Sequence, residues 1–306
     1  MATGGQTGSP RILIVGNAGQ LGKELEKSFA GFGSISGFDR ETFDLADADS
    51  TRALVGRVEP DVILNAAAYT AVDKAESEEK LAYAINATAP GVLAEEAKRR
   101  GALFVHYSTD YVFNGGKKSP WVEADSTGPL NVYGASKLAG EQAVEAVGGN
   151  WLTLRTSWVY GPHGNNFLLT MLRLGREREK LSIVDDQIGA PTTSIELARA
   201  TREIVEGVLA GRYGEAGDWA GLYHMTCGGA TSWCGFAKAI FARAVERLGA
   251  KAPEVSPIST ESYPTPAQRP RYSVLSNQKL AARFGVSLPE WEIALDSVIE
   301  SLAQGK

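Results

Sequence analysis

Short apolar runs alternate with amphipathic stretches through the first half of the chain. The runs are rich in Val, Ile, Leu and Ala, which is typical of strands buried on both faces of a parallel sheet. The stretches between them space their apolar positions as helices do. Predicted strands occupy residues 11–16, 35–39, 61–67, 103–109 and 151–158, and predicted helices occupy about 20–30, 50–58, 76–100 and 134–147. This alternation predicts an α/β fold built on a doubly wound parallel sheet.

The second half of the chain is less regular. Helical patterns cover residues 164–178, 194–209, 232–248 and about 289–303, and residues 221–226 resemble a strand. Five prolines between residues 253 and 270 predict a stretch that is mostly loop. Because no sharp linker separates the halves, we expect a domain of residues 11–160 and a smaller C-terminal α/β lobe of residues 161–306, with elements free to interleave. Residues 1–10, rich in Gly, Thr and Ser, are expected to be a flexible leader and not a signal peptide.

Composition narrows the class of function. The 306 residues are 43% hydrophobic and 22% charged, which is ordinary for a globular protein. The net charge of −5 gives no reason to expect nucleic acid as a partner. No apolar run approaches the roughly 20 residues of a membrane span. Cys227 and Cys234 match no metal motif and are interpreted as free thiols, so a cytoplasmic protein is expected.

Three glycines follow the first predicted strand. Gly16, Gly19 and Gly22 form a Gly-x-x-Gly-x-x-Gly turn between a strand and a helix. Glycines let the turn close and let backbone approach a pyrophosphate, while the N–H groups of the helix N-terminus attract the anion. A tight turn without a ligand can carry the same glycines, but Asp39 ends the next strand, where an acid holds a ribose hydroxyl. The sequence therefore predicts a Rossmann-type dinucleotide-binding domain over residues 11–160.

Two adjacent residues leave the choice between NADH and NADPH open. Asp39 favours NAD through the ribose 2′-hydroxyl, whereas Arg40 can pair with the 2′-phosphate of NADP. Asp44 and Leu45 are expected near the adenine. The small residues 65–68 are expected on the ribose side, where they would let a flat cofactor lie close, although alanines also pack well without a ligand.

A tyrosine and a lysine stand four residues apart in a predicted helix. Positions i and i+4 share a helix face, so Tyr133 and Lys137 can point into one site. A nearby cation lowers the pKa of a tyrosine from its usual value of about 10, which makes the phenol a proton donor or acceptor near neutral pH. Thr109 and Asp110 end the strand of residues 103–109, at the edge where open α/β sheets bind ligands. Thr109 is a candidate to bond a substrate carbonyl oxygen, and turn capping is the equally common alternative for both residues.

Four further segments of the sequence are similar to the motifs of a known protein family. Residues 65–76 read NAAAYTAVDKAE, 108–113 read STDYVF, 155–161 read RTSWVYG and 187–192 read QIGAPT. Together with the glycine turn and the Tyr133–Lys137 pair, these segments resemble the dTDP-4-dehydrorhamnose reductase family of the extended short-chain dehydrogenase/reductase superfamily. The resemblance runs from about residue 11 to residue 300.

The resemblance implies an activity and a role for each catalytic residue. It implies NAD(P)H-dependent reduction of the C4 ketone of dTDP-4-dehydro-L-rhamnose to dTDP-L-rhamnose, a step in the biosynthesis of cell-surface polysaccharide. By resemblance Tyr133 is the proton donor, Lys137 binds the nicotinamide ribose and tunes Tyr133, and Thr109 polarises the keto oxygen. The implied sugar contacts are Thr109, Asp110 and Trp158, and the implied dinucleotide contacts are Gly19, Gln20, Leu21, Gly22, Asp39, Ala68, Tyr69, Thr70 and Tyr107. The family often has a His where Tyr69 stands, so this contact is expected to differ.

Two further expectations concern charge. Arg269 is a candidate for the diphosphate of the dTDP-sugar, with ordinary surface charge as the equal alternative. Some members of the family dimerise through Mg²⁺ held by glutamates, and Glu24, Glu196 and Glu292 stand in comparable contexts. Glutamates on helix faces are more often solvated, so no metal is assigned, and a homodimer with Mg²⁺ is left open.

Two alternatives remain beside this reductase. One is a reductase or epimerase of another nucleotide-sugar within the same superfamily. The other is a non-catalytic regulatory subunit that binds a dinucleotide and a partner enzyme. The complete set of Thr109, Tyr133 and Lys137 argues against the regulatory subunit, because a binding module does not need all three.

Overall fold

A six-stranded parallel sheet forms the centre of the molecule. The computed structural model describes residues 8–304, so most of the predicted leader lies outside the described residues. The strand order is β10-β5-β4-β3-β1-β2, and every neighbouring pair is parallel. The strands are β1 (Arg11–Val15), β2 (Ser34–Phe38), β3 (Val62–Asn65), β4 (Leu103–Thr109), β5 (Trp151–Thr156) and β10 (Gly221–His224). The predicted α/β class is confirmed.

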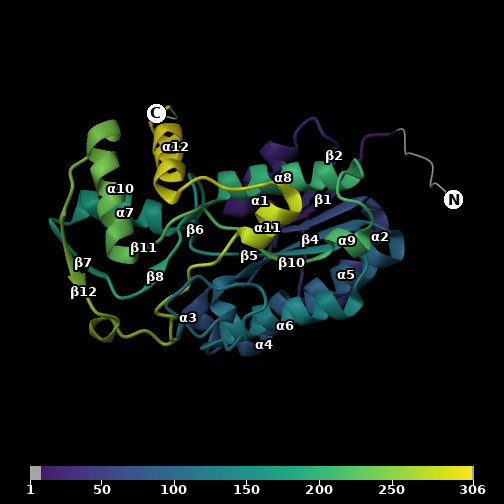
Figure 1. Ribbon diagram of the computed structural model, residues 1–306, viewed down its shortest axis with the longest axis horizontal. Coiled ribbons are helices and arrows are strands. Elements are labelled where there is room, and N and C mark those ends of the chain that lie inside the picture. Colours follow the sequence, from purple (N-terminus) through teal and green to yellow (C-terminus); the bar gives the residue numbers. More distant parts are fainter. Residues whose placement is uncertain (1–7, 305–306) are drawn as a thin grey trace.

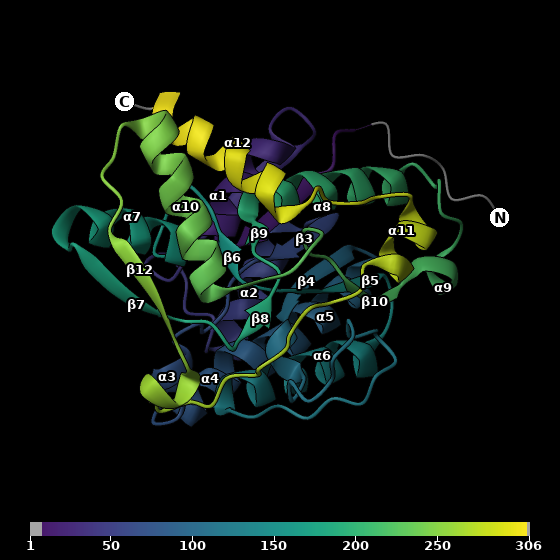
Figure 2. The same cartoon turned by 60° about the vertical axis from the view of Figure 1, so that its left-hand side comes forward.

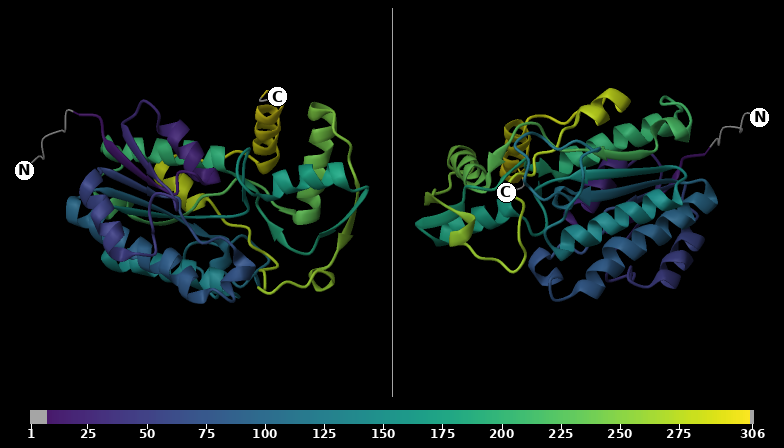
Figure 3. Two further views of the ribbon diagram at one scale, coloured as in Figure 1. Left: turned by 180° about the vertical axis from the view of Figure 1, so that it is seen from behind. Right: turned by 60° about the horizontal axis from the view of Figure 1, so that its bottom comes forward.

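Helices cover both faces of this sheet (Figures 1 and 3). The alternation along β1 shows how the strands serve two cores: Ile12 and Ile14 face one layer, while Leu13 and Val15 face the other. The first layer contains α1 (Gln20–Phe29), α8 (Ser194–Leu209) and α11 (Gln278–Phe284). The second contains α2 (Ala48–Val58), α5 (Ala89–Arg100) and α6 (Val132–Val147). In the right panel of Figure 3, blue and teal helices lie on one side of the sheet and a green helix on the other.

The connection between β3 and β4 is more broken than the single helix predicted over 76–100. It runs through α3 (Val72–Ala75), α4 (Glu79–Tyr83) and a π-helical turn, η1 (Ala84–Thr88), before α5. The turn packs against α6, where a Cβ added at Gly140 would overlap the carbonyl oxygen of Asn86. Such π turns are frequent at functional sites. The η1 turn holds the side chain of Asn86 beneath the candidate active site, which is described below.

A third core lies beside the carboxyl ends of the central strands (Figure 2). It is formed by α7 (Phe167–Glu177), α10 (Trp233–Leu248) and α12 (Trp291–Gln304). A parallel pair, β7 (Lys180–Val184) with β12 (Glu254–Ile258), flanks these helices. The short elements are β6 (Val159–Tyr160), β8 (Ile188–Gly189), β9 (Thr192–Thr193), β11 (Thr231–Ser232), α9 (Ala216–Trp219) and the 3₁₀ turns η2 (Asp110–Val112) and η3 (Thr260–Ser262).

The second half of the chain contributes to one face of the central sheet as well as to the third core. β10 joins the edge of the central sheet beside β5, and α8 packs against α1. β12 lies within the proline-rich stretch that was expected to be mostly loop, and it pairs with β7 on one side only, where Pro257 is tolerated. β10 and α8 thus join the first half of the chain, while the division near residue 160 and the interleaving of the two parts stay predictions. Among residues 8–304, no helix is long and apolar enough to cross a membrane.

Candidate active site

The glycine turn brings backbone from two strands together. Gly16 has φ of +87°, and a Cβ added there would lie 2.7 Å from the backbone nitrogen of Ala67. A Cβ at Gly22 would overlap the carbonyl oxygen of Gly16, so α1 can pack this tightly on the turn because Gly22 has no side chain. Gly19 caps α1 without a side-chain hydrogen bond. The N-terminus of α1 thus offers backbone N–H groups to an anion.

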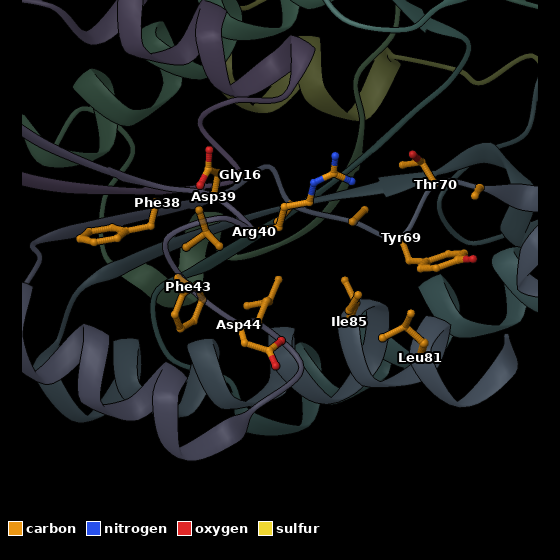
Figure 4. A pocket seen from close by; sticks show the side chains of 15 residues that line it. Gly16, Phe38, Asp39, Arg40, Phe43, Asp44, Tyr69, Thr70, Leu81 and Ile85 are labelled. Carbon is orange, nitrogen blue, oxygen red and sulfur yellow. The ribbon is translucent and has the colours of Figure 1, made fainter.

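A pocket of about 610 Å³ opens beside this turn (Figure 4). Eight of the predicted cofactor contacts line this pocket: Gly16, Asp39, Arg40, Asp44, Leu45, Ala68, Tyr69 and Thr70. Figure 4 shows Arg40 between Asp39 and Tyr69, with Leu81 and Ile85 on the opposite wall. The other predicted contacts do not line this pocket: Gly19, Gln20, Leu21, Gly22, Tyr107, Tyr133 and Lys137. Leu21 is buried, and the Gln20 amide donates to the carbonyl oxygen of Val159 at 3.2 Å.

Asp39 is held as an anion at the mouth of the pocket. Its carboxylate accepts hydrogen bonds from the Thr42 hydroxyl at 3.0 Å and from the backbone N–H of Glu41 at 3.0 Å. The Thr42 hydroxyl and then the Glu41 N–H lower the pKa of Asp39 below its usual value. An oriented, ionised carboxylate of this kind suits a ribose hydroxyl. Tyr69, another residue of the pocket lining, makes a polar contact of its own. Its phenol donates a hydrogen bond to the carboxylate of Glu78 at 2.5 Å, and this contact raises the pKa of Tyr69 to about 12.

Tyr133 and Thr109 meet at the carboxyl end of the sheet. Asn131 caps α6 by accepting a hydrogen bond from the N–H of Gly134 at 2.8 Å. A Cβ on Gly134 would overlap the carbonyl oxygen of Tyr111, so the missing side chain lets the first turn of α6 approach the end of β4. Tyr133 packs edge-on against Tyr111, with ring centroids 5.6 Å apart. The approach places its phenol beside the Thr109 hydroxyl.

The phenol of Tyr133 behaves differently from the sequence expectation. Tyr133 is half-buried, yet the loss of surrounding water raises its pKa to about 12, and only the Thr109 hydroxyl opposes that rise. Lys137 does not contribute to the shift. The lysine is buried, its Nζ donates to the carbonyl oxygen of Tyr107 at 2.6 Å, and burial lowers its pKa to about 8. Tyr133 is therefore a neutral phenol with a proton to give.

Asp110 adds a second buried acid next to Thr109. The Thr109 hydroxyl donates to its Oδ1 at 3.0 Å, while Oδ2 is buried without a hydrogen-bond partner within the described chain. Burial raises the pKa of Asp110 to about 6. Thr109 also caps the η2 turn, since its hydroxyl accepts a hydrogen bond from the N–H of Tyr111 at 3.2 Å. Thr109 therefore caps the η2 turn and also lies in the candidate active site.

Two predicted contacts lie in surroundings other than those expected. The Tyr107 side chain points to the opposite face of the sheet, where its hydroxyl meets that of Thr201 at 2.7 Å, so only its backbone carbonyl faces Lys137. Trp158 stacks on Trp233 with ring centroids 3.5 Å apart and has φ of +47°. Strand alternation explains the first displacement, because adjacent residues of β4 must face opposite layers.

Arg269 forms a two-pronged ion pair with Asp73. Its Nη1 and Nη2 each lie 2.8 Å from a carboxylate oxygen, and this contact lowers the pKa of Asp73. Arg269 also lines a second cavity of about 300 Å³ together with Asn114, Gly115, Gly116, Leu130, Thr260, Glu261, Gln268 and Arg271. Arg271 pairs in turn with Glu261, so both arginines of this cavity face carboxylates, and its contacts do not single it out for an anionic ligand.

Two of the three glutamates considered for a metal pair with separate partners. Glu24 accepts a hydrogen bond from Lys27 at 2.9 Å and lies 3.3 Å from His163, and Glu196 pairs with Arg199 at 2.7 Å. Glu292 lies on α12. Within residues 8–304, no group of three His, Cys, Asp or Glu side chains is placed to hold a metal ion. Nothing in these surroundings supports Mg²⁺.

Sequence reasoning missed the buried groups that hold the site together. The Asn86 amide joins the backbone of Tyr69 to the hydroxyl of Ser136 on α6, at 2.8 to 3.1 Å. Glu141, one turn beyond Lys137, receives a bidentate pair from Arg155 at 2.6 and 2.8 Å. Polar residues inside otherwise apolar strands were the available signal. Their partners lie on other elements and could not be assigned from spacing.

Three features of this site together define the class of protein. They are a glycine turn at a helix N-terminus, an open pocket of dinucleotide size, and a helix that carries Tyr133 and Lys137 at the same edge of the sheet. The chain is a Rossmann-type, nicotinamide-dinucleotide-dependent oxidoreductase. A family model described as "RmlD substrate binding domain" matches residues 10–304. The chain belongs to the dTDP-4-dehydrorhamnose reductase family.

Relatives and solved structures agree on this family. The chain is 49% identical over 295 residues to a dTDP-4-dehydrorhamnose reductase of Burkholderia thailandensis, covering 95% of this chain and 99% of the relative. A crystal structure of a dTDP-4-dehydrorhamnose reductase from Clostridium acetobutylicum has a TM-score of 0.87 and 39% identity, with 95% and 99% coverage. One from Bacillus anthracis, in complex with NADP, has a TM-score of 0.87 and 37% identity, with 96% and 99% coverage.

Proposed function

We propose that this protein reduces the C4 ketone of dTDP-4-dehydro-L-rhamnose to dTDP-L-rhamnose, using NADPH or NADH, in the cytoplasm. The observation that carries the residue roles is the neutral Tyr133 phenol beside the Thr109 hydroxyl at the carboxyl end of β4. The near-full-length likeness to enzymes of that name supports the substrate.

The dinucleotide would bind along the glycine turn and the pocket of Figure 4. Its diphosphate suits the N-terminus of α1, and its adenosine ribose suits Asp39. Arg40 at the exposed rim suits a 2′-phosphate, so both cofactors are accommodated. When bound, the reduced nicotinamide supplies the hydride for the sugar carbonyl carbon.

The chain itself handles the proton. Tyr133 donates its phenolic proton to the carbonyl oxygen as that oxygen becomes an alkoxide, and Thr109 holds the oxygen by a hydrogen bond. By its likeness to the family, Lys137, one helical turn along α6, would bind the nicotinamide ribose, and its effect on Tyr133 would be exerted with the dinucleotide in place. Asp110 and Arg269 would contact the sugar and its diphosphate, and Trp158 would border the nucleotide-sugar.

The test is turnover followed by loss of NADPH or NADH absorbance. Purified protein is mixed with dTDP-4-dehydro-L-rhamnose, with the matching UDP- and GDP-4-keto sugars as controls, and each cofactor is tried in turn. Stoichiometric oxidation with the dTDP-sugar supports the proposal. Preference for a UDP- or GDP-sugar, or interconversion of sugars without net cofactor consumption, would replace it with another reductase or an epimerase. Dinucleotide binding without turnover, together with a stoichiometric protein partner, would favour a regulatory subunit.

A further inference from the structure

A row of polar side chains lies on the sheet face under α6. Strand register places Asn65 of β3 beside His106 of β4, and His106 beside Thr153 of β5. Lys137 reaches this row from α6, with its Nζ 3.2 Å from Nε2 of His106. All four side chains are at most 1% exposed. Buried polar groups are costly unless their donors and acceptors match, so the matching in this row restricts what each member can be.

With the side chains as they stand, not every hydrogen-bond donor in this row faces an acceptor. The Lys137 ammonium can only donate, so Nε2 of His106 must accept, which leaves the imidazole proton on Nδ1. Nδ1 lies 3.1 Å from Nδ2 of Asn65, which is also a donor. At the same time Oδ1 of Asn65 is buried with no partner in the described chain. A half-turn of the amide removes the clash of two donors and gives Oδ1 a partner, because Oδ1 then accepts from Nδ1–H, while Nδ2 takes the former position of Oδ1.

The opposite set of protons would need an uncharged lysine. If Nδ2 of Asn65 donates to Nδ1, the proton of His106 moves to Nε2 and points at Lys137. Two donors then face each other unless Lys137 is a neutral amine. The amide orientation of Asn65, the tautomer of His106 and the charge of Lys137 are therefore one linked choice. A charged imidazole is disfavoured, since burial and then Lys137 lower the pKa of His106 well below its usual value.

We propose that Asn65 and His106 are positioning residues for Lys137 in the reductase. Asn65 fixes the Nδ1–H tautomer through Oδ1, and the lone pair of Nε2 then accepts one N–H of the ammonium. The carbonyl oxygen of Tyr107 accepts a second at 2.6 Å, which leaves the third for the ligand side of the site. The inference rests on the proposed function only in assigning Lys137 to the site of the dinucleotide.

The tautomer can be measured directly. The chain has three histidines, so the protein labelled with ¹⁵N-histidine and saturated with NADPH gives three imidazole patterns in a two-bond ¹H–¹⁵N correlation. His163→Gln and His224→Gln identify the other two patterns by their loss. We expect His106 to be neutral with its proton on Nδ1 near neutral pH. A proton on Nε2, or a charged ring, would overturn the proposal.

A pair of variants on either side of His106 separates positioning from packing. Asn65→Leu removes the acceptor, so only Lys137 still favours the proton on Nδ1; we expect a smaller share of the Nδ1–H tautomer and a kcat lower by roughly ten- to a hundredfold, with KM for the sugar unchanged. Thr153→Val is the control, because its buried hydroxyl also has no partner within the described residues, and it should leave tautomer and kcat as they are. Equal losses in both variants would contradict a specific role.

The wild-type spectrum decides the matter even if Asn65→Leu does not fold. Failure of the two proposals is also distinguishable. A protein that shows the Nδ1–H pattern with NADPH bound but does not reduce the dTDP-sugar refutes the proposed substrate and leaves the role of Asn65 and His106 standing. Turnover together with the Nε2–H pattern does the reverse.

Discussion

The candidate active site has an open end, the pocket beside the glycine turn, and a closed end, the surroundings of Thr109 and Tyr133. The two ends shift the pKa of an aspartate in opposite directions. Asp39 stands at the rim of the dinucleotide pocket, where N–H and hydroxyl donors of its own turn lower its pKa. Asp110 lies at the closed end, where burial raises its pKa to about 6. The open end can therefore hold a ligand through the ionised carboxylate of Asp39 and the free N–H groups at the N-terminus of α1. The closed end excludes water instead, and burial there raises the pKa of both Tyr133 and Asp110, so each acid holds its proton more tightly than usual.

Replacing the phenol should break the closed end most severely. Tyr133→Phe removes the proton donor but keeps the ring that packs on Tyr111, so we expect kcat to fall by about 10²- to 10⁴-fold while NADPH binding is kept. Steady-state kinetics and a fluorescence titration with NADPH measure the two. Tyr111→Phe is the control and should retain most activity. Substantial turnover in Tyr133→Phe would remove the phenol from the proposed mechanism.

The buried acid should leave a mark on stability against pH. Because the pKa of Asp110 is about 6 when folded and about 4 when unfolded, the folded state binds the proton more tightly, and the free energy of unfolding falls as pH rises through this window. The loss is about 3 kcal/mol at most. Asp110→Asn should flatten this part of the profile in urea denaturation from pH 3 to pH 8.

Asp39→Asn is the matched comparison from the open end. The pKa of Asp39 is lowered in the folded state, so its contribution is present above the unfolded pKa and is lost as pH falls. The two variants should therefore change the pH profile with opposite signs. The same sign in both would mean that the two ends do not differ in the way described.

A single methyl group should test the open end. Gly22→Ala places a Cβ against the carbonyl oxygen of Gly16, so the turn must shift away from the N-terminus of α1. We expect a loss of about 1–3 kcal/mol in stability and a clear weakening of NADPH binding. Gly56→Ala in α2 is the control, since its Cβ would meet only Arg100 at 3.8 Å. Calorimetry on both proteins distinguishes a local effect from general helix stiffening.

The smallest expected change concerns cofactor choice. Arg40→Ala should weaken NADPH binding about tenfold and leave NADH binding unchanged, because only NADP carries a phosphate for the guanidinium. Lys23→Ala, an exposed basic residue of α1 that does not line the pocket, should leave both affinities as they are. Equal weakening for NADH would show that Arg40 contacts a part common to both dinucleotides.

The same contrast explains how far the sequence could be followed. The glycine turn, β4 over residues 103–109 and α8 over residues 194–209 were predicted from local spacing, and the structure has them there. Asn65 and His106 were not recognised as partners, because their contact depends on the register between β3 and β4. The pairing of β7 with β12 was missed for a related reason, since neither short strand alternates clearly and Pro257 suggested a loop.

The place of β10 in the sheet also sets an order of events during synthesis. β5 pairs with β4 on one side and with β10 on the other, and the chain from α7 to α9 is made between them. Until residue 224 has left the ribosome, one row of N–H and C=O groups of β5 has no strand to pair with. Such an edge is a template for another chain, so nascent or truncated products that stop before β10 are the ones most exposed to aggregation.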